Sequence, residues 1–239
     1  MMQIETQMNQ LRLRGMARSW QAMVETRRMH ELSFPEGLEI LLQNEADDRS
    51  NRRFERLQTN ARFRYHASIE ELAFDPARGL DKALITNLAT GEYLAKGESV
   101  LITGPAGVGK SFLVSALGLH GCAQGYSVEY CNFQKLLLRV RMARVEGTIL
   151  KLFDKLEKTK LLILDDFGLT HLDNQQQLDL MDIIEDRHGK SSTIIASQLP
   201  VSNWYDVFNE GGIADAVLDR LVHSSYRIEL KGESLRKKR

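Results

Sequence analysis

Apolar residues in the first quarter of the chain recur at the spacing of an α-helix. Four of them follow one another at steps of three and four residues and share one helical face: Leu13, Met16, Trp20 and Met23. Residues 33–36 have the features of a helix start, because Ser33 can cap the helix and Glu36 follows three residues later. No Gly or Pro interrupts residues 38–58. The pattern predicts a small helical N-terminal domain over residues 1–66.

Residues 67–96 show little periodicity and contain Ser68, Pro76 and Gly79, so we expect them to form a linker. From residue 97 onward, short apolar segments alternate with helical ones. The expected strands cover residues 99–103, 127–132, 160–166, 192–196 and 225–230, and the expected helices cover residues 110–124, 133–145, 174–188 and 212–222. This alternation predicts an α/β core domain over residues 97–239, with a parallel sheet and helices on both faces.

Composition narrows the class of protein only slightly. The chain has 239 residues, and Lys+Arg and Asp+Glu both number 32, so any nucleic-acid surface must be local. Cys122 and Cys131 form no CxxC pair, which argues against zinc and disulfides and favours buried thiols in a reducing compartment. No apolar run approaches the roughly 18 residues that span a bilayer, and no signal-peptide core is present. We therefore expect a cytoplasmic protein without membrane contact.

Residues 104–111 match the phosphate-loop pattern GxxxxGK[ST]. Glycines let the backbone N–H groups of such a loop converge on phosphate oxygens, and the following helix adds its positive end. Lys110 would reach the β- and γ-phosphates, and the Ser111 hydroxyl would bind Mg²⁺. A glycine-rich turn without a ligand is the alternative, but the strand before it and the helix after it favour nucleotide binding. The expected nucleotide-binding residues are Gly104, Pro105, Ala106, Gly107, Val108, Gly109, Lys110 and Ser111.

Two adjacent carboxylates, Asp165 and Asp166, end an apolar strand some fifty residues after the phosphate loop. Ionised carboxylates at the end of a buried strand need partners. The first acid of such a strand binds Mg²⁺, and the adjacent one can polarise the attacking water. The alternative is a strand end that simply reaches solvent.

The strand expected at 192–196 ends close to Ser197 and Gln198. In ATPases with this architecture, that strand lies between the phosphate-loop strand and the acidic strand, so its terminal polar residue faces the γ-phosphate. We assign this sensor role to Gln198. An exposed polar turn before Pro200 is the alternative.

Several motifs together resemble AAA+ ATPases of the helicase-loader branch. They are the phosphate loop, LLILDDFG (161–168), STIIASQLP (192–200) and the C-terminal stretch 213–239. More closely, the chain resembles the IstB-like transposition helpers that certain bacterial insertion sequences encode. The similarity covers nearly the whole chain, including LRLRGMA (11–17) and ARFRYHASIEEL (61–72). SNWYDVF (202–208) and LDRLVH (218–223) narrow the match, since many families share the phosphate loop.

The resemblance implies an ATPase that assembles on duplex DNA and engages a cognate transposase. Arg220 matches the family's arginine finger, which reaches the nucleotide of a neighbouring subunit, so the resemblance implies a homo-oligomeric ring or spiral. A surface arginine paired with Asp215 or Asp219 is the alternative.

Two features of the sequence differ from those of most AAA+ ATPases. Asp166 stands where Glu is usual, and the nine residues after 225–230 are too few for a helical lid, with Arg236 a candidate sensor.

The helix expected at 133–145 carries four candidate DNA contacts: Lys135, Arg139, Arg141 and Arg144. Cations there would bind phosphates without reading bases. A solvated helix face is the alternative. In the N-terminal helix, Glu45 with Arg49 and Asp48 with Arg52 can form i,i+4 pairs, and a solvated, self-paired face is the favoured interpretation.

The resulting hypothesis is an ATP- and Mg²⁺-dependent transposition helper. A replicative helicase loader acting on single-stranded DNA and a hexameric helicase is the main alternative. A small-molecule kinase fits less well, because such an enzyme needs no water-activating acid. A non-hydrolysing adaptor would not require Lys110, Asp165 and Asp166 together.

Overall fold

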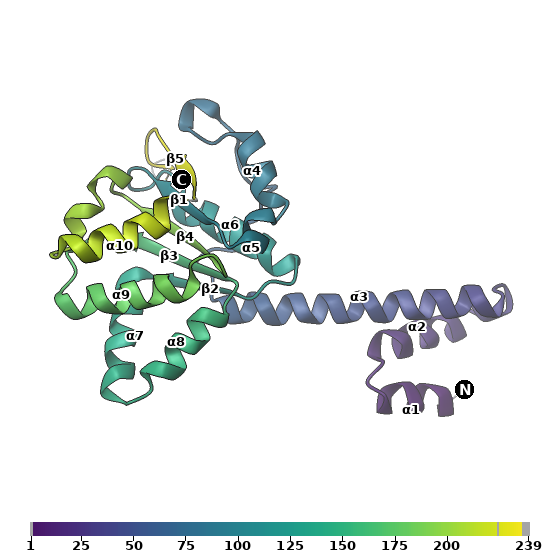
Figure 1. Ribbon diagram of the computed structural model, residues 1–239. Coiled ribbons are helices and arrows are strands. Elements are labelled where there is room, and N and C mark those ends of the chain that lie inside the picture. Colours follow the sequence, from purple (N-terminus) through teal and green to yellow (C-terminus); the bar gives the residue numbers. More distant parts are fainter. Residues whose placement is uncertain (1, 224, 236–239) are drawn as a thin grey trace. The chain divides into compact units, whose positions relative to one another are not determined.

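The computed structural model describes residues 2–223 and 225–235 (Figure 1). Its contacts divide the chain into two compact units, one up to Arg56 and the other from Leu57 onward. The boundary falls within a single long helix, α3 (Phe34–Ala61). The domain limits drawn from the sequence remain predictions.

The N-terminal unit consists of helices. They are α1 (Met2–Gln10), α2 (Arg14–Glu25), the short η1 (Arg28–His30) and α3 (Phe34–Ala61), whose last residues belong to the second unit. The expected start of α3 is confirmed, because the Ser33 N–H and hydroxyl donate to the Glu36 carboxylate at 2.8 and 2.6 Å. Met16, Met23 and Leu41 form a small buried core, with Leu13 and Trp20 packed against it.

The expected ion pairs of α3 are present, with 2.7 Å from Arg49 to Glu45 and 2.7 Å from Arg52 to Asp48. The arginines of these pairs are exposed, as the solvated, self-paired interpretation expects, but their acids are not. Glu45 and Asp48 are buried against α2, because Gly15 allows the two helices to approach closely. The spacing of charged residues in the sequence does not predict a helix–helix contact of this kind.

Residues 67–96, expected to form a linker, contain helical segments: η2 (Pro76–Arg78), α4 (Lys82–Ala89) and α5 (Glu92–Lys96). The Asp81 carboxylate caps α4 by accepting the Ala83 N–H at 2.8 Å, and Ile85 and Leu88 are buried. Helices this short span too few turns to produce a readable apolar period, which explains why the sequence did not reveal them.

The second unit is built on a five-stranded parallel sheet. Its strands are β1 (Ser99–Thr103), β2 (Val128–Asn132), β3 (Leu161–Phe167), β4 (Ser192–Ser197) and β5 (Ser225–Glu229), in the order β2-β3-β4-β1-β5. Three of the strands, β1, β3 and β4, are buried at nearly every residue, as central strands of a parallel sheet covered on both faces require. The predicted α/β fold is confirmed, including the position of β4 between β1 and β3.

Helices cover both faces of the sheet (Figure 1). They are α6 (Lys110–Ala123), α7 (Phe133–Val145), α8 (Ile149–Lys158), α9 (Asn174–Arg187) and α10 (Gly211–Val222), with the short η3 (Val201–Asn203) and η4 (Tyr205–Val207). Helix α6 packs with α4 and α5 on one face, and α7, α9 and α10 pack on the other. The sequence analysis did not identify α8 as a separate helix.

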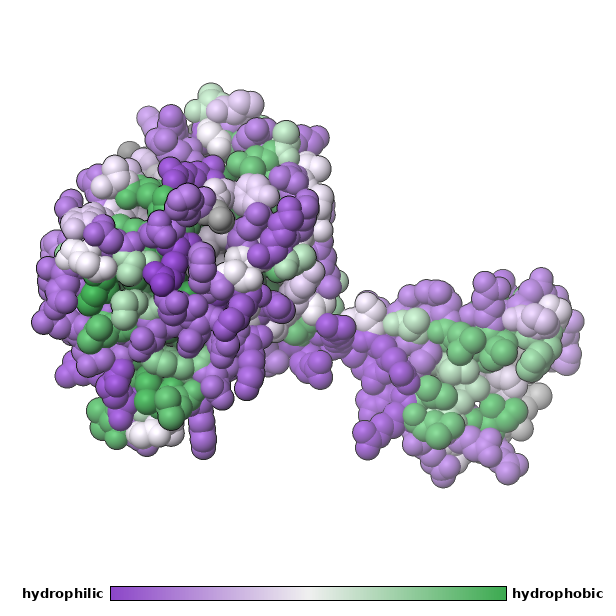
Figure 2. Space-filling view, in the orientation of Figure 1, coloured by the Kyte–Doolittle hydropathy of each residue, from purple (hydrophilic) through white to green (hydrophobic). Residues whose placement is uncertain are grey.

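The surface of the second unit is largely hydrophilic in this view, with apolar side chains gathered at the tip of α7 and α8 (Figure 2). Exposed apolar residues of these two helices are Leu138, Met142, Val145 and Leu150. Within residues 2–223 and 225–235, no helix combines the length and apolar character needed to cross a membrane.

Candidate nucleotide site

The phosphate loop joins β1 to α6 at the carboxyl edge of the sheet. Residues 104–109 lie between the two elements, and Gly109 caps α6 with a φ of 108°. Gly107 has a φ of 82°, and a Cβ at this position would lie 2.1 Å from the Ser234 hydroxyl. The loop therefore has a backbone conformation that larger side chains would obstruct. It precedes the N-terminus of α6, and a helix N-terminus favours the binding of anions.

The Lys110 ammonium lies within this loop. The side chain is buried, and Nζ donates to the carbonyl oxygens of Gly104 at 2.6 Å and Pro105 at 2.8 Å. Ser111 follows in the first turn of α6. The structure thus places a cation and a hydroxyl where the loop meets the helix, which is the arrangement expected for binding phosphate and its metal ion.

Residues 230–235, to which the sequence analysis gave no role, run along the phosphate loop. The Leu230 N–H donates to Thr103 O at 2.8 Å, and the Leu235 N–H donates to Gly107 O at 2.9 Å. Arg78 adds a bond from its guanidinium to Glu233 O at 3.3 Å. This segment supports the loop from outside. Arg236, the candidate sensor, lies outside the described residues.

The acid pair stands at an irregular end of β3. The pairing of β3 with β4 shifts register between Leu164 and Phe167, and Asp166 has a φ of 61°. Such irregularities re-aim side chains and are frequent next to active sites. Asp165 is fully buried, whereas Asp166 is partly exposed at the surface of the site.

Both carboxylates have partners on β2, which the sequence analysis missed. The Tyr130 hydroxyl donates to Asp165, and the Asn132 amide donates to Asp166 at 3.0 Å. Burial and the bond to Asp165 raise the pKa of Tyr130, so its hydroxyl keeps the donated proton at neutral pH. The alternation of β2 could have shown that Tyr130 and Asn132 share a face, but not which strand would lie beside β2.

Arg64 is a further residue that the sequence did not single out. Its Nη1 lies 3.8 Å from Asp165 Oδ2 and 3.5 Å from Asp166 Oδ2. Two adjacent carboxylates repel each other, and the guanidinium between them offsets this repulsion. Arg64 belongs to the segment that carries the family resemblance, yet nothing in its spacing predicts a contact across about a hundred residues.

The residues present fit a magnesium nucleotide. The Ser111 hydroxyl and the Asp165 carboxylate are the hard oxygen ligands that Mg²⁺ prefers, and phosphates and water complete such sites. The described chain contains no cluster of three or more His, Cys, Asp or Glu side chains suited to a metal. Burial raises the pKa of Cys122 to about 12 and that of Cys131 to about 11, so both thiols stay protonated and are poor ligands.

Gln198 directly follows β4 and is exposed. Ser197, the last residue of the strand, pairs in register with Thr103 of β1 and with Phe167 of β3. The Ser197 hydroxyl also donates to Phe167 O at 2.8 Å and fixes the turn. Gln198 therefore begins at the same edge of the sheet as the phosphate loop and the acid pair, and its sensor role remains a prediction.

Arg220 is not gathered with these residues. It donates to Ala216 O at 2.7 Å and forms an ion pair with Glu185 of α9. The acid is thus neither Asp215 nor Asp219, because α10 packs against α9 and brings Glu185 within reach. Among the described contacts of Arg220, none reaches the phosphate loop or the acid pair.

The four candidate DNA contacts on α7 fall into two groups. Arg139 forms an ion pair with Glu129 at 2.6 Å, and Arg144 forms one with Asp179. Lys135 and Arg141 are exposed at the surface of the helix. The two groups differ in how readily they could bind phosphates, and the DNA role of all four stays a prediction.

Solved structures share the fold of much of this chain. The crystal structure of the DnaC helicase loader superposes with a TM-score of 0.61 at 20% identity, covering 70% of this chain and 98% of the loader. The replication initiator DnaA bound to AMPPCP and single-stranded DNA gives a TM-score of 0.56 at 18% identity, covering 70% of this chain and 50% of DnaA. The second unit therefore has the AAA+ fold of these proteins.

Sequence comparison is more specific. The family described as "IstB-like ATP binding protein" matches residues 6–239. An insertion-sequence ATP-binding protein of Sinorhizobium fredii (strain NGR234) is 40% identical over 96% of this chain and 94% of its own length. The ATP-binding protein of insertion sequence IS1162 from Pseudomonas fluorescens is 41% identical over 82% of this chain and 86% of its own. With its phosphate loop and AAA+ fold, the chain belongs to the IstB-like, insertion-sequence-associated ATP-binding proteins.

Proposed function

We propose that this protein is an ATP-dependent transposition helper that assembles on duplex DNA, hydrolyses ATP, and recruits or stimulates a cognate transposase. One observation carries the proposal. In a chain of this family, the phosphate loop, Asp165 and Gln198 lie at the carboxyl ends of β1, β3 and β4, three neighbouring strands. This edge is where open α/β sheets bind their ligands.

Each residue then has a task. The N–H groups of residues 104–109 and the Lys110 ammonium bind phosphates, while Ser111 and Asp165 hold Mg²⁺. Bound Mg²⁺–ATP supplies the phosphoryl group that is transferred to water. Asp166 positions and polarises that water, and Gln198 contacts the γ-phosphate.

The partners of Asp166 suggest slow turnover in the isolated chain. Asn132 and Arg64 both contact Asp166 Oδ2, so they orient the carboxylate and compete with the attacking water for that oxygen. Arg220 would contribute in trans, to the site of a neighbouring subunit, and it must first leave Glu185. Both features favour an ATPase that assembly activates.

A replicative helicase loader is the second candidate, and the structural likeness to the DnaC helicase loader favours it. Such a protein would carry the same nucleotide site. The two candidates differ in the DNA that should stimulate hydrolysis, which is duplex for the transposition helper and single-stranded for the loader.

The deciding experiment is steady-state ATP hydrolysis with no DNA, with long duplex DNA, and with single-stranded DNA of equal length. Lys110→Ala should abolish nucleotide binding, whereas Asp166→Asn should bind ATP normally and hydrolyse it at least ~100-fold more slowly. Stimulation by duplex supports the proposal. Stimulation by single strands alone supports the loader, and normal turnover in Asp166→Asn would refute the role of that residue.

Assembly has its own measurement. Sedimentation with ATP and duplex DNA should show an oligomer, because an arginine finger acting in trans needs a neighbour. A protein that sediments only as a monomer under these conditions would contradict the assignment of Arg220.

A further inference from the structure

A large groove follows the outer edge of the sheet. Its volume is about 1350 Å³, and every residue from Ser127 to Asn132 lines it. These residues include the whole of β2, which is the edge strand and pairs only with β3 in the part of the chain that the structure describes. We call this cavity the β2-edge groove. Unpaired N–H and C=O groups along a strand edge are a template for another strand.

The walls of the groove come from both sides of the sheet. On one side lie residues 57–64, where Phe63 packs edge-on against Tyr130 at 6.5 Å between ring centres and lies against α6 at Gly118. On the other side lie Leu136 of α7 and Leu152 of α8. Helical layers thus extend past β2 on both faces, and the space between them continues the plane of the sheet.

The groove is positively charged. Its lining contains Glu129 and Asp166 against five cations: Arg62, Arg64, Lys135, Arg139 and Lys155. Burial raises the pKa of Glu129, but its bonds to Lys155 and Arg139 outweigh this effect and hold the pKa below the usual value, so the carboxylate is ionised. The five cations thus outnumber the two carboxylates by three. The groove therefore has cationic donors to spare for an acidic guest.

We propose that the β2-edge groove binds an extended acidic peptide segment of a partner protein, which adds to β2 as a sixth strand. The strand edge supplies main-chain hydrogen bonds, and the cations select acidic side chains. Single-stranded nucleic acid fits less well, because such ligands stack their bases on aromatic side chains. Tyr130 is the aromatic residue of the described lining, and its ring is packed against Phe63 while its hydroxyl is bound to Asp165.

The groove ends at the nucleotide site. Arg64 and Asn132, which engage Asp166, line both the groove and the acid pair. A strand added to β2 therefore contacts the residues that hold the water-activating acid. Peptide binding itself does not require ATP hydrolysis, since no residue of the phosphate loop is among the described residues that line the groove.

The test is fluorescence anisotropy with the full chain, without nucleotide, and a labelled eight-residue peptide of alternating Glu and Val. We expect a Kd below about 100 µM. The same peptide carrying N-methyl groups on alternate residues cannot pair with β2 and should bind at least ~10-fold more weakly. A Lys-Val peptide should bind no better than the N-methylated one, because the groove repels cations.

Two variants on α7 form a matched pair. Lys135 lines the groove and Arg141 does not, although both are exposed on one helix. Lys135→Glu should weaken binding about fivefold or more, and Arg141→Glu less than about twofold. Equal effects of the two variants, equal binding of the N-methylated peptide, or absence of binding would overturn the proposal. It would also fail if an oligothymidylate displaced the peptide with the same dependence on Lys135. Failure of the ATPase assay alone would leave peptide binding intact.

Discussion

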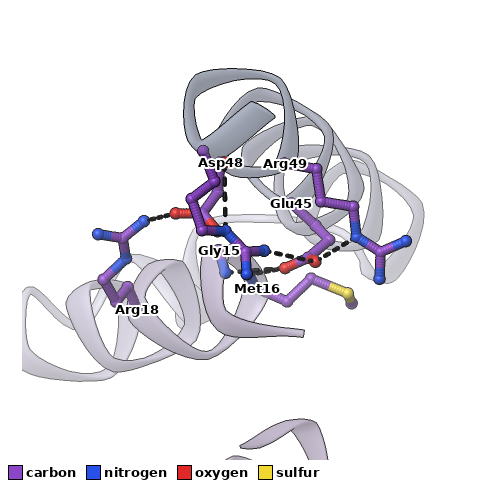
Figure 3. Close-up of polar contacts among 7 residues, drawn as sticks. Gly15, Met16, Arg18, Glu45, Asp48 and Arg49 are labelled. Carbon is purple, nitrogen blue, oxygen red and sulfur yellow. Dashed lines mark hydrogen bonds and ion pairs between the residues drawn. The ribbon is translucent and has the colours of Figure 1, made fainter. Parts of the chain in front are cut away.

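In each unit of this protein, a buried charged side chain binds the backbone groups at one end of a helix. The side chain is an anion in the N-terminal unit and a cation in the second unit. In the N-terminal unit, the Glu45 carboxylate of α3 accepts the N–H groups of Gly15 and Met16 at 2.8 and 3.2 Å, at the start of α2 (Figure 3). In the second unit, the Arg187 guanidinium of α9 donates to the carbonyls of Leu156 and Thr159 at the end of α8. An anion at a helix N-terminus and a cation at a C-terminus both satisfy unpaired backbone groups and oppose the helix dipole.

The surroundings of these two charges differ. Arg187 also donates to Ser192 O and to the Thr193 hydroxyl, and it is 1% exposed. Burial lowers its pKa to about 10, so it stays protonated at neutral pH. An extensive apolar core between sheet and helices lies around it. Glu45 has only a small core beside it, made of Met16, Met23 and Leu41.

This contrast shows how stability is distributed. The second unit buries most of the apolar surface, so the hydrophobic effect already favours its fold. Polar contacts such as those of Arg187 add to that stability. The N-terminal unit buries little, and a unit this small is marginal on its core alone. Polar contacts must therefore provide a larger share of its stability: Glu45 with Arg49, and Asp48 with Arg18 and Arg52.

Removing the clamp of the second unit should have the largest effect. Arg187→Met leaves buried carbonyl groups without donors, and we expect a loss of about 3 kcal/mol or more in the free energy of unfolding. Thermal unfolding followed by circular dichroism measures it. Arg187→Lys is the matched control. Its free energy of unfolding should fall less, because an ammonium can still donate hydrogen bonds to some of these carbonyl groups. A loss below about 1 kcal/mol for Arg187→Met would contradict the clamp.

The corresponding change in the N-terminal unit is Glu45→Gln. We expect a loss of about 1–3 kcal/mol in local stability, because the α2 N–H groups exchange a charged acceptor for a neutral one. Hydrogen exchange of residues 14–25 measures the effect, and thermal unfolding of the second unit should not change.

The Glu45 contribution should also depend on pH. Burial raises the pKa of Glu45, but the bonds from Arg49, Met16 and Gly15 outweigh it and hold the pKa below 4.5. A lowered folded-state pKa means that the stabilisation is complete above pH 4.5 and disappears as the pH falls through the folded-state value. The exchange difference between wild type and Glu45→Gln should therefore shrink below about pH 4. A difference that stays constant down to pH 3 would exclude this carboxylate as the cause.

A third change tests how closely the two helices approach. A Cβ at Gly15 would lie 2.4 Å from Asn44 O and 2.7 Å from the Glu45 Cα, both backbone atoms. Gly15→Ala should destabilise the N-terminal unit by about 1–3 kcal/mol, seen as faster proteolysis within α2. Gly37→Ala, also on a helix of this unit, meets no atom within 4 Å and should be neutral or stabilising by up to about 1 kcal/mol. Equal behaviour of the two variants would refute the close contact.

The smallest effect concerns the partly exposed ion pair of Arg220 with Glu185. Exposed ion pairs contribute about 0–1 kcal/mol, so Glu185→Gln should free the arginine and raise DNA-stimulated ATP turnover by about twofold. Arg220→Ala should abolish that stimulation. If Glu185→Gln lowers turnover as strongly as Arg220→Ala does, the pair itself is needed and the finger role is in doubt.

The sequence by itself determined those features that depend on neighbours along the chain. The phosphate loop needs glycines and Lys110 at fixed spacing, and its position between a strand and a helix can be read from the apolar pattern. The start of α3 is equally local, since Ser33 and Glu36 are three residues apart. The parallel sheet follows from alternating strands and helices, and the place of β4 follows from the family that the motifs resemble.

Tertiary structure alone decided which distant groups meet. Arg64 lies beside Asp165 and Asp166, which are 101 and 102 residues away in the chain. Glu185 lies 35 residues from its partner Arg220, and Glu45 lies 30 residues from its partner Gly15. Such contacts depend on how helices and strands pack, and packing responds to the shape and burial of many side chains together. The spacing of charges along one helix predicts its i,i+4 pairs, but it cannot predict whether that face meets water or another helix.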